Sequence, residues 1–201
     1  MLAERYYASM PVSSWIGKNS SSTTYENLTF VLSGNLVARG NGTSNVSIFK
    51  MSGAFDWDNQ AYCLTAFTPP CTLEFNKWSG TQDNGYSYTM IGWNTDPTTN
   101  PSYTSLDYAS FPYSQSYYQV YNNGVAASPG GTWSSLNKWY IVYGTDGSIK
   151  HYNGSTLLYS ASTASTASRY IDSSFHSPGA TFGGLSSLRV IKKAWNGTSY
   201  T

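Results

Sequence analysis

Two tight-turn signals that lie close together constrain the fold more than any other feature of the chain. Asp146-Gly147 and Asn153-Gly154 both fall within the segment 139–159, WYIVYGTDGSIKHYNGSTLLY. Asp-Gly and Asn-Gly reach the positive φ values of a type I′ turn at little steric cost, so each is predicted to join two antiparallel strands. The residues between the turns are too few for a helix. The segment therefore predicts a three-strand antiparallel meander, and a second sheet must cover its apolar face.

The length and the low charge of the chain favour one large all-β domain with a polar but nearly uncharged surface. A chain of 201 residues suits a single sandwich. Charged residues make up 10% of it, against a typical ~25%, so Ser, Thr, Asn, Gly and Tyr must supply the surface polarity. Surfaces rich in Tyr, Ser and Asn are common in recognition sites. The formal net charge of +1 and the lack of a basic run disfavour nucleic-acid binding. No apolar run long enough to predict membrane insertion is present.

The chain divides into three predicted segments. Residues 1–26 are a lead-in segment, and regular structure is expected to start near Asn27. Residues 27–193 form the main domain. Residues 194–201 are a tail that could lie against the lead-in or continue into a larger parent polypeptide. The small-residue stretch 160–170 is predicted to be a loop or an edge strand, and no helix longer than a turn or two is expected.

Two pairs of reactive side chains leave alternatives open. Cys63 and Cys71 flank a segment with a double proline, and a turn there could bring them together on paired strands. Both a disulfide and two buried thiols are compatible with this spacing. Asp56 and Asp58 lie in a predicted turn, where they could bind a metal or act as acid and base. Carboxylates in turns more often accept hydrogen bonds from backbone amides, and we favour that interpretation.

The segment 88–124 holds the best candidates for a binding site. Strands are expected at 88–93, 105–111 and 117–121, with a loop set by two prolines after the first. Aromatic rings stack on the C–H faces of sugars, and Asn and Asp bind sugar hydroxyls, so this segment is typical of a glycan-binding surface. The alternative is that an aromatic residue such as Trp93 or Tyr108 fills the core between the sheets. The predicted glycan-binding residues are Trp93, Asn94, Asp96, Tyr103, Asp107, Tyr108 and Tyr113.

The order of motifs along the chain carries a family resemblance. The motifs are SGNLVARGNGT, AFDWDNQAY, a strand pair marked by Cys and Pro, MIGWNTDPTTNPSYTSLDYA, VYNNG and the meander. This order resembles the concanavalin A-like lectin/glucanase superfamily over roughly residues 27–193. It is similar in particular to laminin-G-like jelly-roll modules on phage tails and on surface proteins of large DNA viruses. The resemblance implies an all-β, two-sheet antiparallel jelly-roll sandwich, a virion-surface or extracellular location, and glycan contacts at loops or at the concave sheet face.

The resemblance does not decide between binding and catalysis. Retaining glucanases of this superfamily carry alternating acids on one strand. The chain has three glutamates, Glu4, Glu26 and Glu74, and none has an acidic neighbour at that spacing, so this route of hydrolysis is disfavoured. A polysaccharide lyase stays open, because it needs a Tyr or His base and a group that neutralises a carboxylate. The residues that could supply these groups are His151 with Tyr152, and Arg169 with Tyr170 near His176.

Three functional hypotheses follow. The first is a non-catalytic carbohydrate-binding module on a viral or phage particle, which contacts host-surface or cell-wall polysaccharide. The second is an enzyme that degrades cell-wall polysaccharide, either a lyase or an unusual glycoside hydrolase. The third is a structural virion module that associates with copies of itself. No cofactor is expected, and Ca²⁺ held by Asn94, Asp96 and Asp107 is the one metal site to consider, although these residues match no known motif.

Overall fold

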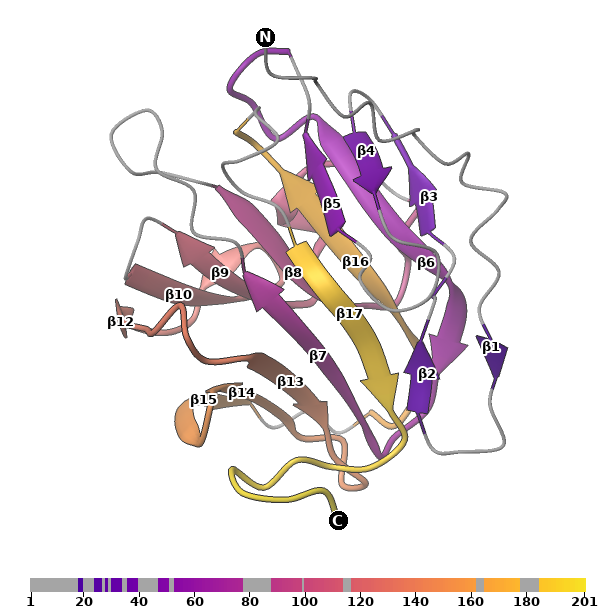
Figure 1. Ribbon diagram of the computed structural model, residues 1–201, viewed down its shortest axis with the longest axis vertical. Helices are drawn as coiled ribbons and strands as arrows, with labels where there is room; N and C mark the ends of the chain where they lie inside the picture. The colour runs from indigo at the N-terminus through magenta and orange to yellow at the C-terminus, as the bar shows by residue number, and fades with distance from the viewer. Residues whose placement is uncertain are drawn as a thin grey trace, which may run out of the picture.

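Two antiparallel β-sheets packed face to face make up the described part of the chain in the computed structural model (Figure 1). The structure describes residues 18–19, 24–26, 28, 30–33, 36–39, 47–50, 53–77, 88–98, 100–113, 117–161, 165–177 and 185–201. Neighbouring strands are often distant in sequence, as expected for a jelly roll. The predicted all-β, two-sheet antiparallel sandwich is confirmed. Within the described residues the one helical stretch is a 3₁₀ turn, η2 (Tyr103–Ser105).

Sheet A contains the meander and the last strand of the chain. Two short strands, β1 (Lys18–Asn19) and β2 (Thr24–Glu26), come before Asn27, near which regular structure was expected to start. In spatial order the strands of sheet A are β1 (Lys18–Asn19), β2 (Thr24–Glu26), β17 (Leu185–Ile191), β7 (Cys71–Lys77), β13 (Trp139–Tyr143), β14 (Ile149–Asn153) and β15 (Thr156–Ala161), with β5 (Ser47–Lys50) beside β17 and β4 (Leu36–Arg39) beside β5.

Sheet B contains the strands of the predicted binding segment. β16, an inner strand of this sheet, begins at Arg169. The prediction of a loop or edge strand over residues 160–170 was therefore wrong for its last two residues. Figure 1 shows β16 between β8 and β6. In spatial order the strands of sheet B are β11 (Val125–Ala126), β10 (Tyr117–Asn122), β9 (Tyr108–Tyr113), β8 (Thr89–Asn94), β16 (Arg169–Phe175), β6 (Asn59–Phe67) and β3 (Phe30–Leu32), with β12 (Gly131–Thr132) beside β10.

The predicted meander is confirmed as β13, β14 and β15, but its turns are not of type I′. Strand pairing ends at Tyr143 and resumes at Ile149, and of the residues between them Gly147 has a positive φ of 79°. The second turn has Gly154 at φ 61° in the first central position, which fits type II′. The two consecutive positive φ values of a type I′ turn occur instead at Asn123 and Gly124, between β10 and β11.

The main core lies between the two sheets. Alternate residues of each strand point inward, so Trp139, Ile141 and Tyr143 of β13 are buried in the same cluster as Ile91 and Trp93 of β8.

The two cysteines lie in this core as unbridged thiols. Burial raises the pKa of Cys63 to about 11 and that of Cys71 to about 12, so both are protonated at neutral pH. Of the two alternatives left open by the sequence, the structure shows buried thiols rather than a disulfide.

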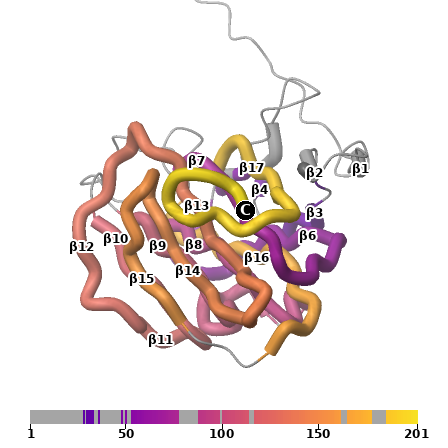
Figure 2. The backbone as a smooth tube through the Cα atoms, turned by 90° about the horizontal axis from the view of Figure 1, so that it is seen from below, coloured from indigo at the N-terminus to yellow at the C-terminus, as the bar shows by residue number. Residues whose placement is uncertain are grey.

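The tail 194–201 packs against the outer face of sheet A (Figure 2). The ring of Trp195 stacks on Tyr140 of β13, with centroids 4.6 Å apart and an angle of 13° between planes. The hydroxyl of Tyr200 donates to Oε2 of Glu74 on β7 at 2.7 Å. The boundaries at residues 27 and 193 stay predictions. Among the described residues, no helix is long and apolar enough to cross a membrane.

Candidate functional site

The two sequence-predicted residues on β8 are inaccessible. Trp93 is 0% exposed, and its indole Nε1 donates to the carbonyl oxygen of Ile141 across the sandwich at 3.1 Å. Asn94 is also buried, and its amide donates to Oδ2 of Asp172 at 2.8 Å. The expectation that this segment exposes Trp93 and Asn94 was wrong. Trp93 fills the core between the sheets, which was the alternative that the sequence left open.

Asp107 and Tyr108 are held by a buried arginine. Nη1 of Arg169 donates to Oδ2 of Asp107 at 2.6 Å, and its guanidinium lies 4.9 Å from the ring centroid of Tyr108. The same Oδ2 accepts hydrogen bonds from the backbone N–H and the hydroxyl of Thr95. These contacts fix the start of β9, and the Asp107 carboxylate is used in hydrogen bonds that stabilise the fold.

The three residues considered for calcium do not form an open oxygen cage. Asp96 is exposed, and its backbone N–H donates to Oδ1 of Asn94 at 3.2 Å. Arg169 already places positive charge at Oδ2 of Asp107. A calcium site built from Asn94, Asp96 and Asp107 therefore does not fit the donors around these residues. Among the described residues, no group of three or more His, Cys, Asp or Glu side chains could hold a metal ion.

A second hydrophobic cluster lies on the outer face of sheet B. On β8, Ile91 and Trp93 point into the main core while Met90 belongs to this second cluster, so the two clusters lie on opposite faces of the sheet. On β9, Phe111 belongs to the second cluster and is nearly buried. Aromatic rings from β9 and β10, from Tyr88 just before β8, from η2 and from the turn 53–58 surround it. We call the following residues the aromatic patch: Trp57, Tyr88, Tyr103, Phe111, Tyr113, Tyr117 and Tyr121.

The rings of the aromatic patch form one continuous set of contacts around Phe111. Ring centroids of Trp57 and Tyr88 each lie 5.6 Å from Phe111, and that of Tyr113 lies 4.8 Å away in a stacked arrangement. Tyr117 stacks on Tyr113 at 6.3 Å and is 54% exposed. The rings around Phe111 are half-buried, so each presents part of its face or edge to solvent.

Tyr103 and Tyr113 are the sequence-predicted residues that the structure brings into this patch. Tyr103 lies in η2, where its ring contacts Trp57 at 5.1 Å and Tyr121 at 5.6 Å. The other patch residues were not predicted to bind: Trp57, Tyr88, Phe111, Tyr117 and Tyr121. The spacing of Tyr117 and Tyr121 on one strand, with Phe111 and Tyr113 on its partner, was the signal that could have found them, because residues two apart share a face.

A buried polar cluster holds the loop that follows β8 against the outer face of sheet B, at Pro97 and at Pro101. Asp172 of β16 is 0% exposed and accepts hydrogen bonds from the side-chain amides of Gln60 and Asn94 at 2.8–3.0 Å. The Gln60 amide also donates to the carbonyl oxygen of Pro97, and the Ser174 hydroxyl donates to that of Pro101. This loop leads directly into η2, so the polar cluster positions the Tyr103 end of the patch.

The environment of Asp172 also changes its acidity. Burial raises the pKa of Asp172 to about 7, even though hydrogen bonds from Asn94, Gln60 and the Ser173 backbone act in the opposite direction. Asp172 does not reach solvent, so its protonation changes the charge inside the polar cluster and not at the surface.

The turn 53–58 carries Trp57 at the other end of the patch. Oδ1 of Asp56 accepts a hydrogen bond from the backbone N–H of Trp57 at 2.7 Å, which agrees with the interpretation of these carboxylates as acceptors for backbone amides. Asp58 instead forms an ion pair with Lys50, and the hydrogen bond from that ammonium lowers the pKa of Asp58.

The residues considered for a lyase are not assembled around one site. His151 is buried between the sheets, where Nδ1 shares a hydrogen bond with the hydroxyl of Ser110 at 2.8 Å, and burial lowers its pKa to about 3. Arg169 points into the core, whereas His176 lies beside the aromatic patch, with its ring 5.2 Å from Trp57. The geometry therefore brings no base and exposed cation together from these residues.

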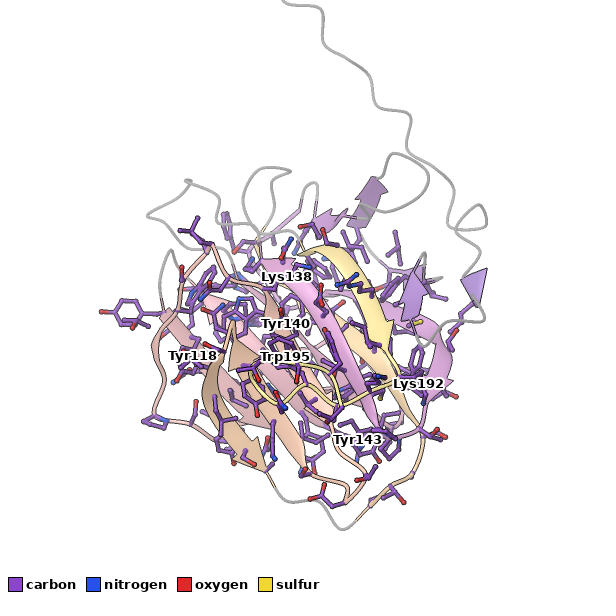
Figure 3. All side chains as sticks on the ribbon, turned by 60° about the horizontal axis from the view of Figure 1, so that its bottom comes forward. Tyr118, Lys138, Tyr140, Tyr143, Lys192 and Trp195 are labelled. Carbon is purple, nitrogen blue, oxygen red and sulfur yellow. The ribbon has the colours of Figure 1, made fainter. Side chains whose placement is uncertain are left out.

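Glu74 of β7 lies on the opposite side of the molecule. It accepts hydrogen bonds from Lys138, Arg189 and Tyr200 on the outer face of sheet A. Burial acts to raise the pKa of Glu74, but these three donors together lower it. Figure 3 shows Lys138, Tyr140 and Trp195 on this face. The tail covers the β7–β13 region of this face with its own side chains, so we place the candidate site on sheet B.

Comparisons with known proteins give no family for the chain. No protein-family model and no curated protein matches it. Solved structures with a similar fold include the PSpry domain of TRIM65, with a TM-score of 0.47 and 13% identity over 71% of this chain and 80% of that chain. They also include Bacillus licheniformis β-glucanase, with a TM-score of 0.48 and 9% identity over 82% of this chain and 92% of that chain.

Botulinum neurotoxin type C, whose cell entry depends on interaction with two ganglioside molecules, also has a similar fold. The TM-score is 0.48 and the identity 10%, over 85% of this chain and 44% of that chain, so the match spans less than half of the toxin chain. Likenesses at this level carry no argument about family, substrate or partner. The resemblance of the sequence to the concanavalin A-like superfamily stays at the level of a two-sheet jelly-roll fold.

Proposed function

We propose that the protein binds polysaccharide through the aromatic patch on sheet B, without catalysis. The observation that carries this proposal is the continuous set of half-exposed aromatic rings on one sheet face, from Trp57 to Tyr117. In most proteins such rings are turned into the core, and a contiguous apolar patch left at the surface marks an interaction site. Flat aromatic rings with polar groups at their edges suit the C–H faces and hydroxyls of sugar rings.

The charges of sheet B favour a neutral polysaccharide over an acidic one. The strands of this sheet contain one cation, Arg169, and it points inward and pairs with Asp107. The acids Asp56 and Asp96 lie exposed in the turn and the loop at the rim. A uronic or sialic acid polymer would meet carboxylates without an exposed cation on these strands, and like charges repel. A lyase for such polymers is disfavoured for the same reason.

Retention on insoluble polysaccharides tests the proposal. Purified protein is incubated with cellulose, chitin, mannan, β-1,3-glucan and an acidic polymer, and the bound fraction is measured against concentration. We expect retention on at least one neutral polymer and none on the acidic polymer. Tyr117→Ala removes an exposed ring of the patch, and we expect about a tenfold or greater loss of affinity, which is the scale for an aromatic anchor.

Tyr140→Ala, on sheet A, is the matched control and should retain wild-type affinity. Unchanged retention of the Tyr117→Ala and Tyr113→Ala variants would exclude the aromatic patch as the binding surface. Soluble sugar products released from the same polymers would show catalysis instead. Sedimentation of the protein alone addresses the structural-module hypothesis, because a patch that is covered by a second copy would give a dimer that Tyr117→Ala dissociates.

The location of the protein on a virion or another extracellular surface is also part of the proposal. The resemblance of the sequence to phage and large-virus surface modules supports display on a virion or another extracellular surface, with host-surface polysaccharide as the partner. Binding to intact cells of a candidate host, with competition by the soluble polymer, tests this location.

A further inference from the structure

Lys50 is a charged residue that the fold encloses completely. It is the last residue of β5, and its side chain is 0% exposed. Its ammonium donates hydrogen bonds to the carbonyl oxygens of Ala54 at 2.7 Å and Asp56 at 3.0 Å. It also contacts Oδ1 of Asp58 at 2.5 Å and the carbonyl oxygen of His176 at 3.2 Å.

These four oxygens form a complete cage for one positive charge. An ammonium group has three protons and no acceptor, and here each proton has an oxygen within reach. Three neutral carbonyls and one carboxylate are also the kind of oxygen set that binds a hard metal cation. In this chain the cation is covalently attached. Without it, the carboxylate of Asp58 and the inward-pointing carbonyl dipoles would repel one another.

The cage joins the turn 53–58 to the end of β16. Three of the oxygens come from the turn, and the fourth comes from His176, directly after β16. Trp57 lies in sequence between Asp56 and Asp58, and both of these residues give an oxygen to the cage. The centroid of its ring lies 5.2 Å from that of His176 and 5.6 Å from that of Phe111. The position of Trp57 at the rim of the patch therefore depends on a turn that Lys50 holds closed.

We propose that Lys50 is a positioning residue for the aromatic patch: its ammonium takes the place that a metal ion would have in this oxygen cage and sets the position of Trp57. This inference rests on the proposed function in one respect, the expectation that glycan binding needs the Lys50 charge. It follows that glycan binding requires this ammonium and does not require a divalent metal.

The first experiment compares two substitutions that remove the charge of a lysine and keep most of its length. Lys50→Met removes the caged ammonium, and Lys150→Met changes a half-exposed lysine of β14 on sheet A. The full chain is labelled with 5-fluorotryptophan, and the Trp57 resonance is assigned from Trp57→Phe. We expect Lys50→Met to shift or broaden that resonance and to weaken polysaccharide retention about tenfold or more. Lys150→Met should change neither.

Chemical rescue separates a positioning charge from a general packing role. Lys50→Ala leaves space for a short amine, so propylammonium should restore both the Trp57 resonance and retention to within about threefold of wild type. Propan-1-ol has the same length and no charge, and it should restore neither. Retention by the wild type should be the same with and without EDTA.

A second variant covers the case in which neither Lys50 variant folds. Asp58→Asn keeps the shape of the partner and removes its charge at a half-exposed position, so it should fold and shift the Trp57 resonance in the same direction. The inference is overturned if Lys50→Met folds and its Trp57 resonance is unchanged. If neither Lys50 variant folds, an unchanged Trp57 resonance in Asp58→Asn overturns it. Equal rescue by propan-1-ol, or loss of wild-type retention in EDTA, would overturn it as well.

The two proposals fail in distinguishable ways. A wild-type protein that is retained by no polysaccharide refutes the proposed function, while the Trp57 resonance still reports whether Lys50 positions the turn. Normal retention by Lys50→Met with a shifted Trp57 resonance refutes the functional part of this inference and leaves the proposed function in place.

Discussion

Asp172 is a carboxylic acid whose ionisation the fold changes strongly. Burial raises its pKa to about 7 from 3.8, and the nearby charge of Asp96 acts in the same direction. Between these two values the folded protein binds a proton that the unfolded chain has lost. The contribution of Asp172 to stability is therefore fully present below about pH 4 and is lost as the pH rises through 7.

Asp172→Asn tests whether ionisation of Asp172 lowers the stability of the fold as the pH rises. The variant cannot ionise at residue 172, so the wild-type free energy of unfolding minus that of the variant should become smaller between pH 4 and pH 7.5. Urea unfolding at pH 4, 5.5 and 7.5 measures it, and the histidines cancel in the difference because both proteins contain them. Ser160→Ala, at an exposed position of edge strand β15 in the other sheet, is the control and should show no such trend. A difference that stays constant with pH would contradict a raised pKa.

At the scale of single residues, the sequence predicted the kind of side chain in the site better than its direction. Tyr103 and Tyr113 lie in the patch, whereas Trp93 lies in the core. The cause is the two-residue period of a strand: a shift of one position moves a side chain to the other face. Composition shows that a strand is present in 88–93 but not which of its residues face the second sheet.

At the scale of elements, local turn signals were informative and non-local pairing was not. The meander was predicted because its turns lie between consecutive strands. Strand β16 was missed because Arg169–Phe175 contains Asp172, Ser173 and Ser174, which favour a loop by composition. The groups that form hydrogen bonds with these side chains belong to Gln60, Asn94 and Pro101, which are distant in sequence. Nothing near β16 therefore indicated that its polar side chains would find hydrogen-bond partners inside a sheet.

The pairing of β8 with β9 depends on a glycine. A Cβ atom at Gly92 would lie 1.7 Å from the carbonyl oxygen of Tyr108 and 2.7 Å from Cα of Ala109, and both are backbone atoms. Gly92→Ala should therefore push the two strands apart and lower the free energy of unfolding by about 2 kcal/mol or more. Urea unfolding measures the loss. Ser160→Ala, on the exposed face of edge strand β15, should stay within about 0.5 kcal/mol of wild type. Equal stability of the two variants would refute the close approach.

At the scale of the whole molecule, the two sheet faces have different exposure and charge. Residues 194–201 cover the β7–β13 region of the outer face of sheet A, where Tyr200 donates to Glu74 and Trp195 stacks on Tyr140. The outer face of sheet B carries the aromatic patch. The tail should therefore contribute to stability but not to binding.

Truncation after Lys193 tests this division in one protein. Removal of the Trp195–Tyr140 stack and of the Tyr200–Glu74 hydrogen bond should lower the free energy of unfolding by about 2 kcal/mol, the usual scale of one aromatic pair plus one hydrogen bond to a charged group. Tyr200→Phe removes only the hydroxyl and should give about half of that loss. Both variants should keep wild-type retention on the polysaccharide that binds the intact chain, because their changes lie on the opposite sheet. If the truncated protein still unfolds cooperatively but has lost retention, the glycan contacts the tail face, and the assignment of binding to sheet B fails.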